Sequence, residues 1–298
     1  MRARYFLFIV VVPLIFVAAL AVGAWYLWGR PPGPPAIAFA PYQDGYQTKP
    51  DFARLEHELL LTPTQLSAIT PQSLKALDQE QINQLYARLT AGPIPDGPFR
   101  GDLFFPKGAS GDPRLAEIVG GLKGLGLEIG TLKAEVLGRT LWKGKVFYRD
   151  QRVLRNRIDD LAVLKPVIGG ETDKIQRLAF DGKTTWLLIP AKLYCGQSLL
   201  DGRRESIIID YAFNDDVEGY RENPDFLAGR RGLAIRDEIR MVRPGFYLGR
   251  AYMKGVFLLN FTLENDEIAK RDTSAFVNTG KIAEDCWVGT QKVVTLPR

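Results

Sequence analysis

The chain has 298 residues, enough for one large domain or two small ones, and its 46% hydrophobic and 24% charged residues exclude a mainly disordered or collagen-like protein. The formal net charge of +5 suggests an acidic partner, but three of the 39 basic residues lie in residues 1–30, which contain no acidic residue. Residues 31–298 therefore carry 36 basic and 34 acidic side chains, a net charge of +2. Such a nearly neutral region lacks the excess of basic residues that is typical of nucleic-acid binding, and we expect no nucleic-acid partner.

Histidine and cysteine are scarce, which removes several kinds of catalytic site. The single histidine, His57, has no second histidine four residues later, so the zinc-protease motif is absent. The sequence has no G-x-S-x-G motif for a nucleophilic serine. The glycine-rich residues 120–126 lack the G-K-[ST] of a phosphate-binding loop. We therefore expect no metal ion and no cofactor.

Residues 5–28 form an uncharged, mainly apolar segment of 24 residues, preceded by two arginines. A helix of about 20 apolar residues spans a bilayer. The positive-inside rule then places the N-terminus in the cytoplasm and exports the C-terminal domain to the periplasmic or extracellular face. A cleaved signal peptide with small residues at 22–24 is the alternative. We expect residues 1–30 to be an uncleaved single-pass signal anchor.

A linker and a helical region follow the predicted anchor. Four prolines among residues 31–35 indicate a stiff, extended segment, and we assign residues 31–50 to a proline-rich linker. Thr62-Pro63 and Thr70-Pro71 each combine an N-cap residue with proline at the first helical position, which predicts short helices between residues 51 and 90.

The remainder of the predicted helical region is rich in glycine and proline. Residues 93–101 contain three prolines and two glycines and indicate a turn-rich crossing. Residues 113–138 are apolar but interrupted by glycines, which favours a broken helix, with a strand from Leu127 onward as the alternative. We assign residues 51–140 to a helical cover over the domain that follows.

From Trp142 onward the hydrophobic period changes to two, which predicts strands. Asp181-Gly182 and Pro244-Gly245 mark tight reversals between them. The predicted strands are 142–149, 152–158, 175–181, 184–193, 205–213, 234–243, 245–253 and 255–263. Closing a meander removes its unpaired edges, so we expect residues 141–298 to form an antiparallel meander β-barrel in an α+β fold.

The two cysteines, Cys195 and Cys286, are interpreted as one disulfide. An exported chain with an even number of cysteines favours pairing in an oxidising compartment. Two buried free thiols are the alternative.

Several polar residues interrupt apolar strands of the predicted barrel. Inward-facing residues recur at every second position of a barrel strand, so polar residues on an apolar face can line a cavity with a few polar anchors. A solvent-facing network of ion pairs is the alternative. The candidates for ligand-binding residues are Asn156, Tyr211, Asp237, Arg250 and Asn260.

The strand pattern resembles the lipocalin-like, or calycin, barrels, in which a tryptophan on the first strand packs under a late arginine. Trp142 and Arg250, or Arg243, are the corresponding residues over at most residues 142–263. The G-x-W of that family is missing, because Gly138 stands four residues before Trp142. The resemblance implies a cavity for a lipid or another apolar molecule.

Three hypotheses for the function follow from these patterns. The first is a membrane-tethered domain that binds a lipid or another hydrophobic small molecule in the barrel. The second is an isomerase, lyase or hydrolase on the same barrel, with Asp237 as the acid or base and with Tyr211 and Arg250 stabilising an oxyanion. The third is a structural or assembly protein of the cell envelope that docks through its helices.

Overall fold

A computed structural model describes residues 36–41, 50–104, 142–161, 164, 168 and 172–289 of the chain. The chain divides into the units Met1–Ile37 and Ala38–Arg298, and every element below belongs to the second. No helix among the described residues is long and apolar enough to cross a membrane. The predicted anchor, 1–30, most of the predicted linker and the segment 113–138 lie outside the described residues.

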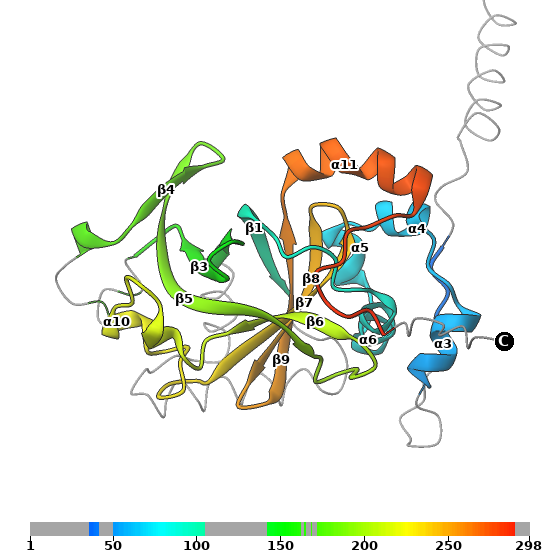
Figure 1. Ribbon diagram of the computed structural model, residues 1–298, viewed down its shortest axis with the longest axis horizontal. Coiled ribbons are helices and arrows are strands. Elements are labelled where there is room, and N and C mark those ends of the chain that lie inside the picture. Colours follow the sequence, from blue (N-terminus) through cyan, green and yellow to red (C-terminus); the bar gives the residue numbers. More distant parts are fainter. Residues whose placement is uncertain are drawn as a thin grey trace, which may run out of the picture. The chain divides into compact units, whose positions relative to one another are not determined.

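The centre of the second unit is a closed antiparallel barrel (Figure 1). The strands run in the order β3-β2-β1-β9-β8-β7-β6-β5-β4, and pairing between β3 and β5 closes eight of them into the barrel. β4 pairs with β5 and lies outside the ring. The strands are β1 (Gly97–Phe104), β2 (Trp142–Tyr148), β3 (Val153–Ile158), β4 (Arg177–Phe180), β5 (Lys183–Gln197), β6 (Glu205–Asp210), β7 (Ile235–Arg243), β8 (Phe246–Met253) and β9 (Val256–Glu264).

The predicted α+β fold with an antiparallel meander barrel is confirmed, and each of the eight predicted strands corresponds to one of β2 to β9. The expectation of a turn-rich crossing over residues 93–101 is wrong from Gly97 onward, because this segment begins β1. β1 pairs with β2 and β9 and so completes the ring. The sequence pattern indicated a turn because the strand contains Gly97, Pro98 and Gly101, residue types that are uncommon in strands. A proline is tolerated near the start of a strand.

Short helices pack on the barrel, as the paired cap-and-proline signals predicted. Thr62 and Thr70 each close a capping box, and Asp78 closes a third. α11 was not predicted; it begins after the N-cap Asn265 and ends at Gly280 in the left-handed conformation. The helices are α3 (Phe52–Glu58), α4 (Pro63–Ser67), α5 (Pro71–Ala76), α6 (Gln79–Arg88), η4 (Thr172–Lys174), η5 (Asn214–Asp216), α10 (Glu222–Asp225) and α11 (Asp266–Thr279).

Two glycines allow large aromatic rings to lie flat against the inner wall of the barrel. A Cβ on Gly101 would lie 2.3 Å from the Trp142 ring, and a Cβ on Gly249 would lie 2.2 Å from the Phe261 ring. The two rings meet edge to face with their centroids 5.7 Å apart. Glycine at these two positions is therefore required by the way the interior is packed.

The outer wall of β7 is also buried, because α6 and the segment before β6 cover it. Arg240 has no solvent exposure and donates to Ser206 Oγ at 2.9 Å and to the backbone oxygen of Tyr86 at 3.1 Å. It also forms an ion pair with Asp201 at 3.3 Å. A buried guanidinium must have such partners, because an unpaired buried charge is strongly destabilising. Arg240 therefore joins α6 to the barrel.

The predicted disulfide is confirmed between Cys195 on β5 and Cys286, which are 91 residues apart in the sequence. Beside it, the Glu205 amide donates to the backbone oxygen of Trp287 at 2.9 Å. The disulfide therefore ties the segment that follows α11 to β5 and β6.

We predict that Arg240→Ala lowers the free energy of unfolding by about 3–5 kcal/mol, because it breaks a buried ion pair and removes the donor to one hydroxyl and three backbone oxygens. Asp201 retains Arg203 as a partner. Chemical denaturation of the full chain measures the change. Arg54→Ala is the matched control, since the Arg54 side chain is 74% exposed and pairs with Glu58 within one helix. Equal effects of the two substitutions would contradict the assigned role of Arg240.

Candidate functional site

The barrel contains a cavity of about 260 Å³ at the end where β2, β7 and β9 begin. Its walls are almost entirely apolar, and its polar residues come from strands on several sides of the ring. The lining residues are Leu103, Trp142, Lys145, Asn156, Ile158, Ile189, Tyr211, Ala228, Ile235, Asp237, Ala251, Leu258, Leu259 and Phe261.

Four polar side chains meet at this cavity, and we call them the polar cluster: Lys145, Asn156, Tyr211 and Asp237. The Lys145 ammonium donates to Asn156 Oδ1 at 2.9 Å, to the Tyr211 hydroxyl at 2.6 Å and to Asp237 Oδ2 at 3.0 Å. The Lys145 and Asp237 side chains are 3% and 7% exposed. The cluster is thus a buried ion pair with two neutral hydrogen-bonding partners.

The strand register places these side chains together. Lys145 on β2 lies directly opposite Asn156 on β3, and both face inward. Asp237 on β7 lies opposite Ile209 of β6, and Tyr211 follows Ile209 by two positions on the same inward face. The polar cluster therefore joins opposite sides of the closed ring.

A bulge in β5 supplies a further partner for Asn156. Ile189 has a φ of +53°, an unusual backbone conformation for a β-branched residue, and the β3–β5 register shifts at this point. Asn156 Nδ2 donates to the Ile189 carbonyl at 2.8 Å, and the Ile189 amide donates to Asp225 Oδ1 at 2.7 Å. The bulge therefore fixes the orientation of the Asn156 amide.

Aromatic rings surround the Lys145 ammonium. The nitrogen lies 5.3 Å from the centroids of Trp142 and Tyr211 and 5.4 Å from that of Phe261. These distances are within the range of cation–π attraction, which strengthens in a desolvated site. The rings stabilise the buried charge and also form the apolar wall of the cavity.

Burial and neighbouring charges shift the pKa values of two residues of the polar cluster, Tyr211 and Lys145. Burial raises the pKa of Tyr211 to about 12, although the Lys145 ammonium favours the phenolate. Burial alone would lower the pKa of Lys145, but Tyr211 and Asp237 outweigh it and raise that pKa. At neutral pH the phenol is therefore neutral and the lysine is charged, so Lys145 is not a free amine nucleophile.

Three of the five candidate residues, Asn156, Tyr211 and Asp237, meet at the cavity, and two do not. The Arg250 side chain points out of the barrel and donates to Asn83 Oδ1 on α6 at 2.7 Å. Asn260 also faces outward and donates to Gln79 Oε1 on α6 at 2.8 Å. The expectation that all five share one interior face therefore does not hold, because α6 buries the outer faces of β8 and β9.

Lys145 completes the polar cluster and was missed from the sequence. Lys145 and Phe147 are two positions apart on β2, so Lys145 lies on the same face of the strand as a core residue. The late arginines do not cover Trp142 as the lipocalin pattern requires: Arg250 lies over Phe257 at 4.2 Å, and Arg243 lies over Phe246 at 4.8 Å.

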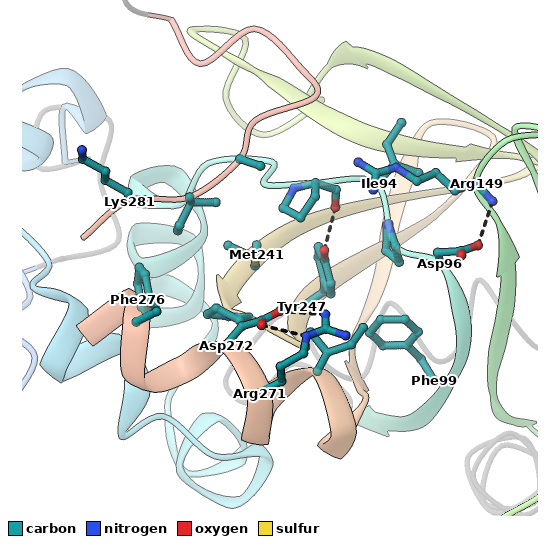
Figure 2. A pocket seen from close by; sticks show the side chains of 18 residues that line it. Ile94, Asp96, Phe99, Arg149, Met241, Tyr247, Arg271, Asp272, Phe276 and Lys281 are labelled. Atoms are coloured by element: carbon teal, nitrogen blue, oxygen red, sulfur yellow. Dashed lines mark hydrogen bonds and ion pairs between the residues drawn. The ribbon is translucent and has the colours of Figure 1, made fainter. Parts of the chain in front are cut away.

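A second cavity of about 430 Å³ lies at the opposite end of the barrel, under α11. Figure 2 shows Phe99 and Tyr247 in this cavity, with Arg271 and Asp272 in front of them. The Arg271 and Asp272 side chains are 71% and 40% exposed and pair with each other at 2.8 Å. Exposed, mutually paired charges select a ligand weakly, so the cavity with the polar cluster is the stronger candidate.

One set of metal-ligating residue types lies close together among the described residues. Cys195, Cys286 and Glu205 have their ligand atoms within 4.8 Å of one another. Metal ions bind cysteine as the thiolate, whereas both sulfurs here are joined in the disulfide. This set therefore does not fit a metal ion.

The sequence matches no protein-family model and no curated protein. A solved structure described as a protein from Thermomonospora curvata is 18% identical, with 63% of this chain and 88% of that chain covered and a TM-score of 0.33. A likeness at this level adds nothing to the argument for the fold or the function, which rests on the geometry above.

We predict that the stabilising effect of the Tyr211 hydroxyl is lost at high pH. A phenol whose pKa rises from 10 when unfolded to about 12 when folded stabilises the protein fully below pH 10 and loses this contribution as the pH rises through 12. The free energy of unfolding of the wild type should therefore fall toward, or below, that of Tyr211→Phe over this interval. Parallel chemical denaturation of both proteins tests this, and a constant difference would contradict it.

Proposed function

We propose that the exported domain binds a small hydrophobic molecule inside the barrel. The observation that carries the proposal is an apolar pocket of about 260 Å³ that opens at one end of the closed barrel, with the buried polar cluster at its wall. Ligand sites of this type combine apolar walls with a few fixed polar groups. The cluster supplies fixed polar groups, because its members hold one another in place.

The volume of the cavity limits the ligand. Sites for drug-sized molecules have volumes of roughly 300–1,000 Å³, and the cavity lies just below this range at about 260 Å³. A single short acyl chain or a small ring system suits this space better than a lipid with two chains. We therefore narrow the proposed ligand from lipids in general to one small apolar molecule.

Catalysis on the same barrel is supported less well. An acid or base at Asp237 would have to act through Oδ1 alone, because Oδ2 is held by the Lys145 ammonium at 3.0 Å. Arg250, the residue proposed to stabilise an oxyanion, faces α6 instead. These two observations favour binding over the isomerase, lyase or hydrolase alternative.

An assembly role through the helices is also supported less well. Leu74, Ile82 and Leu85 of these helices are buried and unavailable for docking, whereas Leu60, between α3 and α4, is 71% exposed. The membrane tether remains part of the proposal on the sequence pattern of residues 5–28, as does the exported location.

Filling the cavity should abolish binding. Ala251 lines the cavity, so Ala251→Phe should remove at least about nine-tenths of the indole binding that isothermal titration calorimetry detects with the full chain in lipid nanodiscs, because the added ring occupies the space. Indole is a suitable probe because it is small and uncharged. Mass spectrometry of an organic extract should recover a small apolar molecule from the wild type and not from Ala251→Phe.

Ala275→Phe is the matched control, since Ala275 lies on α11 at the second cavity. It should bind indole as the wild type does. Equal binding by the wild type and Ala251→Phe, with no molecule recovered from either, would reject the proposed function.

A further inference from the structure

We propose that the cavity selects an uncharged ligand with a hydroxyl group over a carboxylate of the same size. This inference rests on the proposed function and names the ligand class. It follows from a count of donors and acceptors in the polar cluster and from the charge that the cluster already carries.

The N–H donors of the polar cluster are engaged within it, and the Tyr211 O–H lies 3.4 Å from both Asp237 Oδ2 and Asn156 Oδ1. An ammonium has three N–H groups, and those of Lys145 reach Asn156, Tyr211 and Asp237. Trp142 Nε1 donates to Asn156 Oδ1 at 2.8 Å, and Asn156 Nδ2 donates to the Ile189 carbonyl and, at 3.0 Å, to the Tyr211 hydroxyl. A carboxylate entering the cavity would find each of these donors already engaged.

An acceptor, in contrast, is left over. The contacts of Asp237 within the polar cluster all go to Oδ2, and Oδ1 has no hydrogen-bond partner among the described residues. Asp237 lines the cavity. A hydroxyl group on the ligand can donate to this oxygen, and a hydrogen bond to a charged acceptor is stronger than one to a neutral acceptor.

Charge leads to the same conclusion. Lys145 is the only cation among the lining residues, and Asp237 neutralises it at 3.0 Å. A carboxylate would add a second negative charge beside the Asp237 side chain, which is only 7% exposed, or would draw Lys145 away and leave Asp237 unpaired. Both arrangements are strongly unfavourable for buried charges. An alcohol adds no charge and leaves the ion pair intact.

The test compares octanol, octanoate and heptyl methyl ether, an isomer of octanol without a hydroxyl donor. Isothermal titration calorimetry is performed at neutral pH with the full chain in lipid nanodiscs, with empty nanodiscs and Ala251→Phe as blanks. We expect octanol to bind at least about tenfold more tightly than octanoate and severalfold more tightly than the ether.

Asp237→Asn should largely remove the preference for octanol over octanoate. The amide keeps the shape of the side chain, adds an N–H donor and leaves the charge of Lys145 without a counterion, so the octanol-to-octanoate affinity ratio should fall at least about tenfold. Asp173→Asn changes the net charge by the same amount at a side chain that is 99% exposed, and it should leave the ratio unchanged. The double variant Lys145→Met/Asp237→Leu is neutral, and it should lose the preference for octanol over the ether while still excluding octanoate.

The outcomes separate the two proposals. If octanoate binds the wild type as tightly as octanol and Ala251→Phe removes both signals, the selection is wrong and the proposed function stands. If Ala251→Phe removes no signal for any of the three ligands, the proposed function fails and the selection fails with it. The wild-type comparison and the double variant decide the question even where Asp237→Asn does not fold.

Discussion

The ammonium of Lys145 lies 3.0 Å from the carboxylate of Asp237, and the two side chains are only 3% and 7% exposed. Removing two charges from water is costly, and the cost is offset only where geometry and additional hydrogen bonds are favourable. Here Tyr211 and Asn156 supply the hydrogen bonds, and three aromatic rings surround the ammonium. The site therefore depends on a full set of neighbours that come from different strands of one closed ring.

That ring depends on β1, the strand with the weakest sequence signal. β1 pairs with β2 on one side and β9 on the other, so it connects the strand of Lys145 to the strand of Phe261. Gly101 on β1 also leaves the space that the Trp142 ring occupies. Gly101 therefore both weakens the period-two pattern of the strand and makes room for a ring of the cavity wall.

The sequence predicted the parts of the molecule that local patterns determine. The cap-and-proline pairs at Thr62 and Thr70 begin helices, and the alternating segments after Trp142 form strands, because both signals act over a few residues. The side of the wall that a polar residue faces depends on distant segments. Asn156, Tyr211 and Asp237 point inward, whereas Arg250 and Asn260 point toward α6, and alternation alone does not distinguish these cases. Lys145 was missed for a related reason, because a lysine in a strand reads as a solvent-facing residue.

The two faces of the barrel wall bury charge in different ways. On the outer face, Arg240 donates to the backbone oxygen of Tyr86 in the last turn of α6, where the negative end of the helix dipole favours a cation; the same oxygen also accepts from the Leu89 amide. Both cations pair with a carboxylate, Arg240 with Asp201 and Lys145 with Asp237. On the inner face, the ammonium of Lys145 donates to side chains of other strands in the described part of the chain, and to no helix carbonyl there. A carboxylate has more acceptor sites than one lysine occupies. The inner ion pair therefore leaves Asp237 Oδ1 without a hydrogen-bond partner among the described residues, whereas the hydrogen bonds of Arg240 join α6 to the barrel.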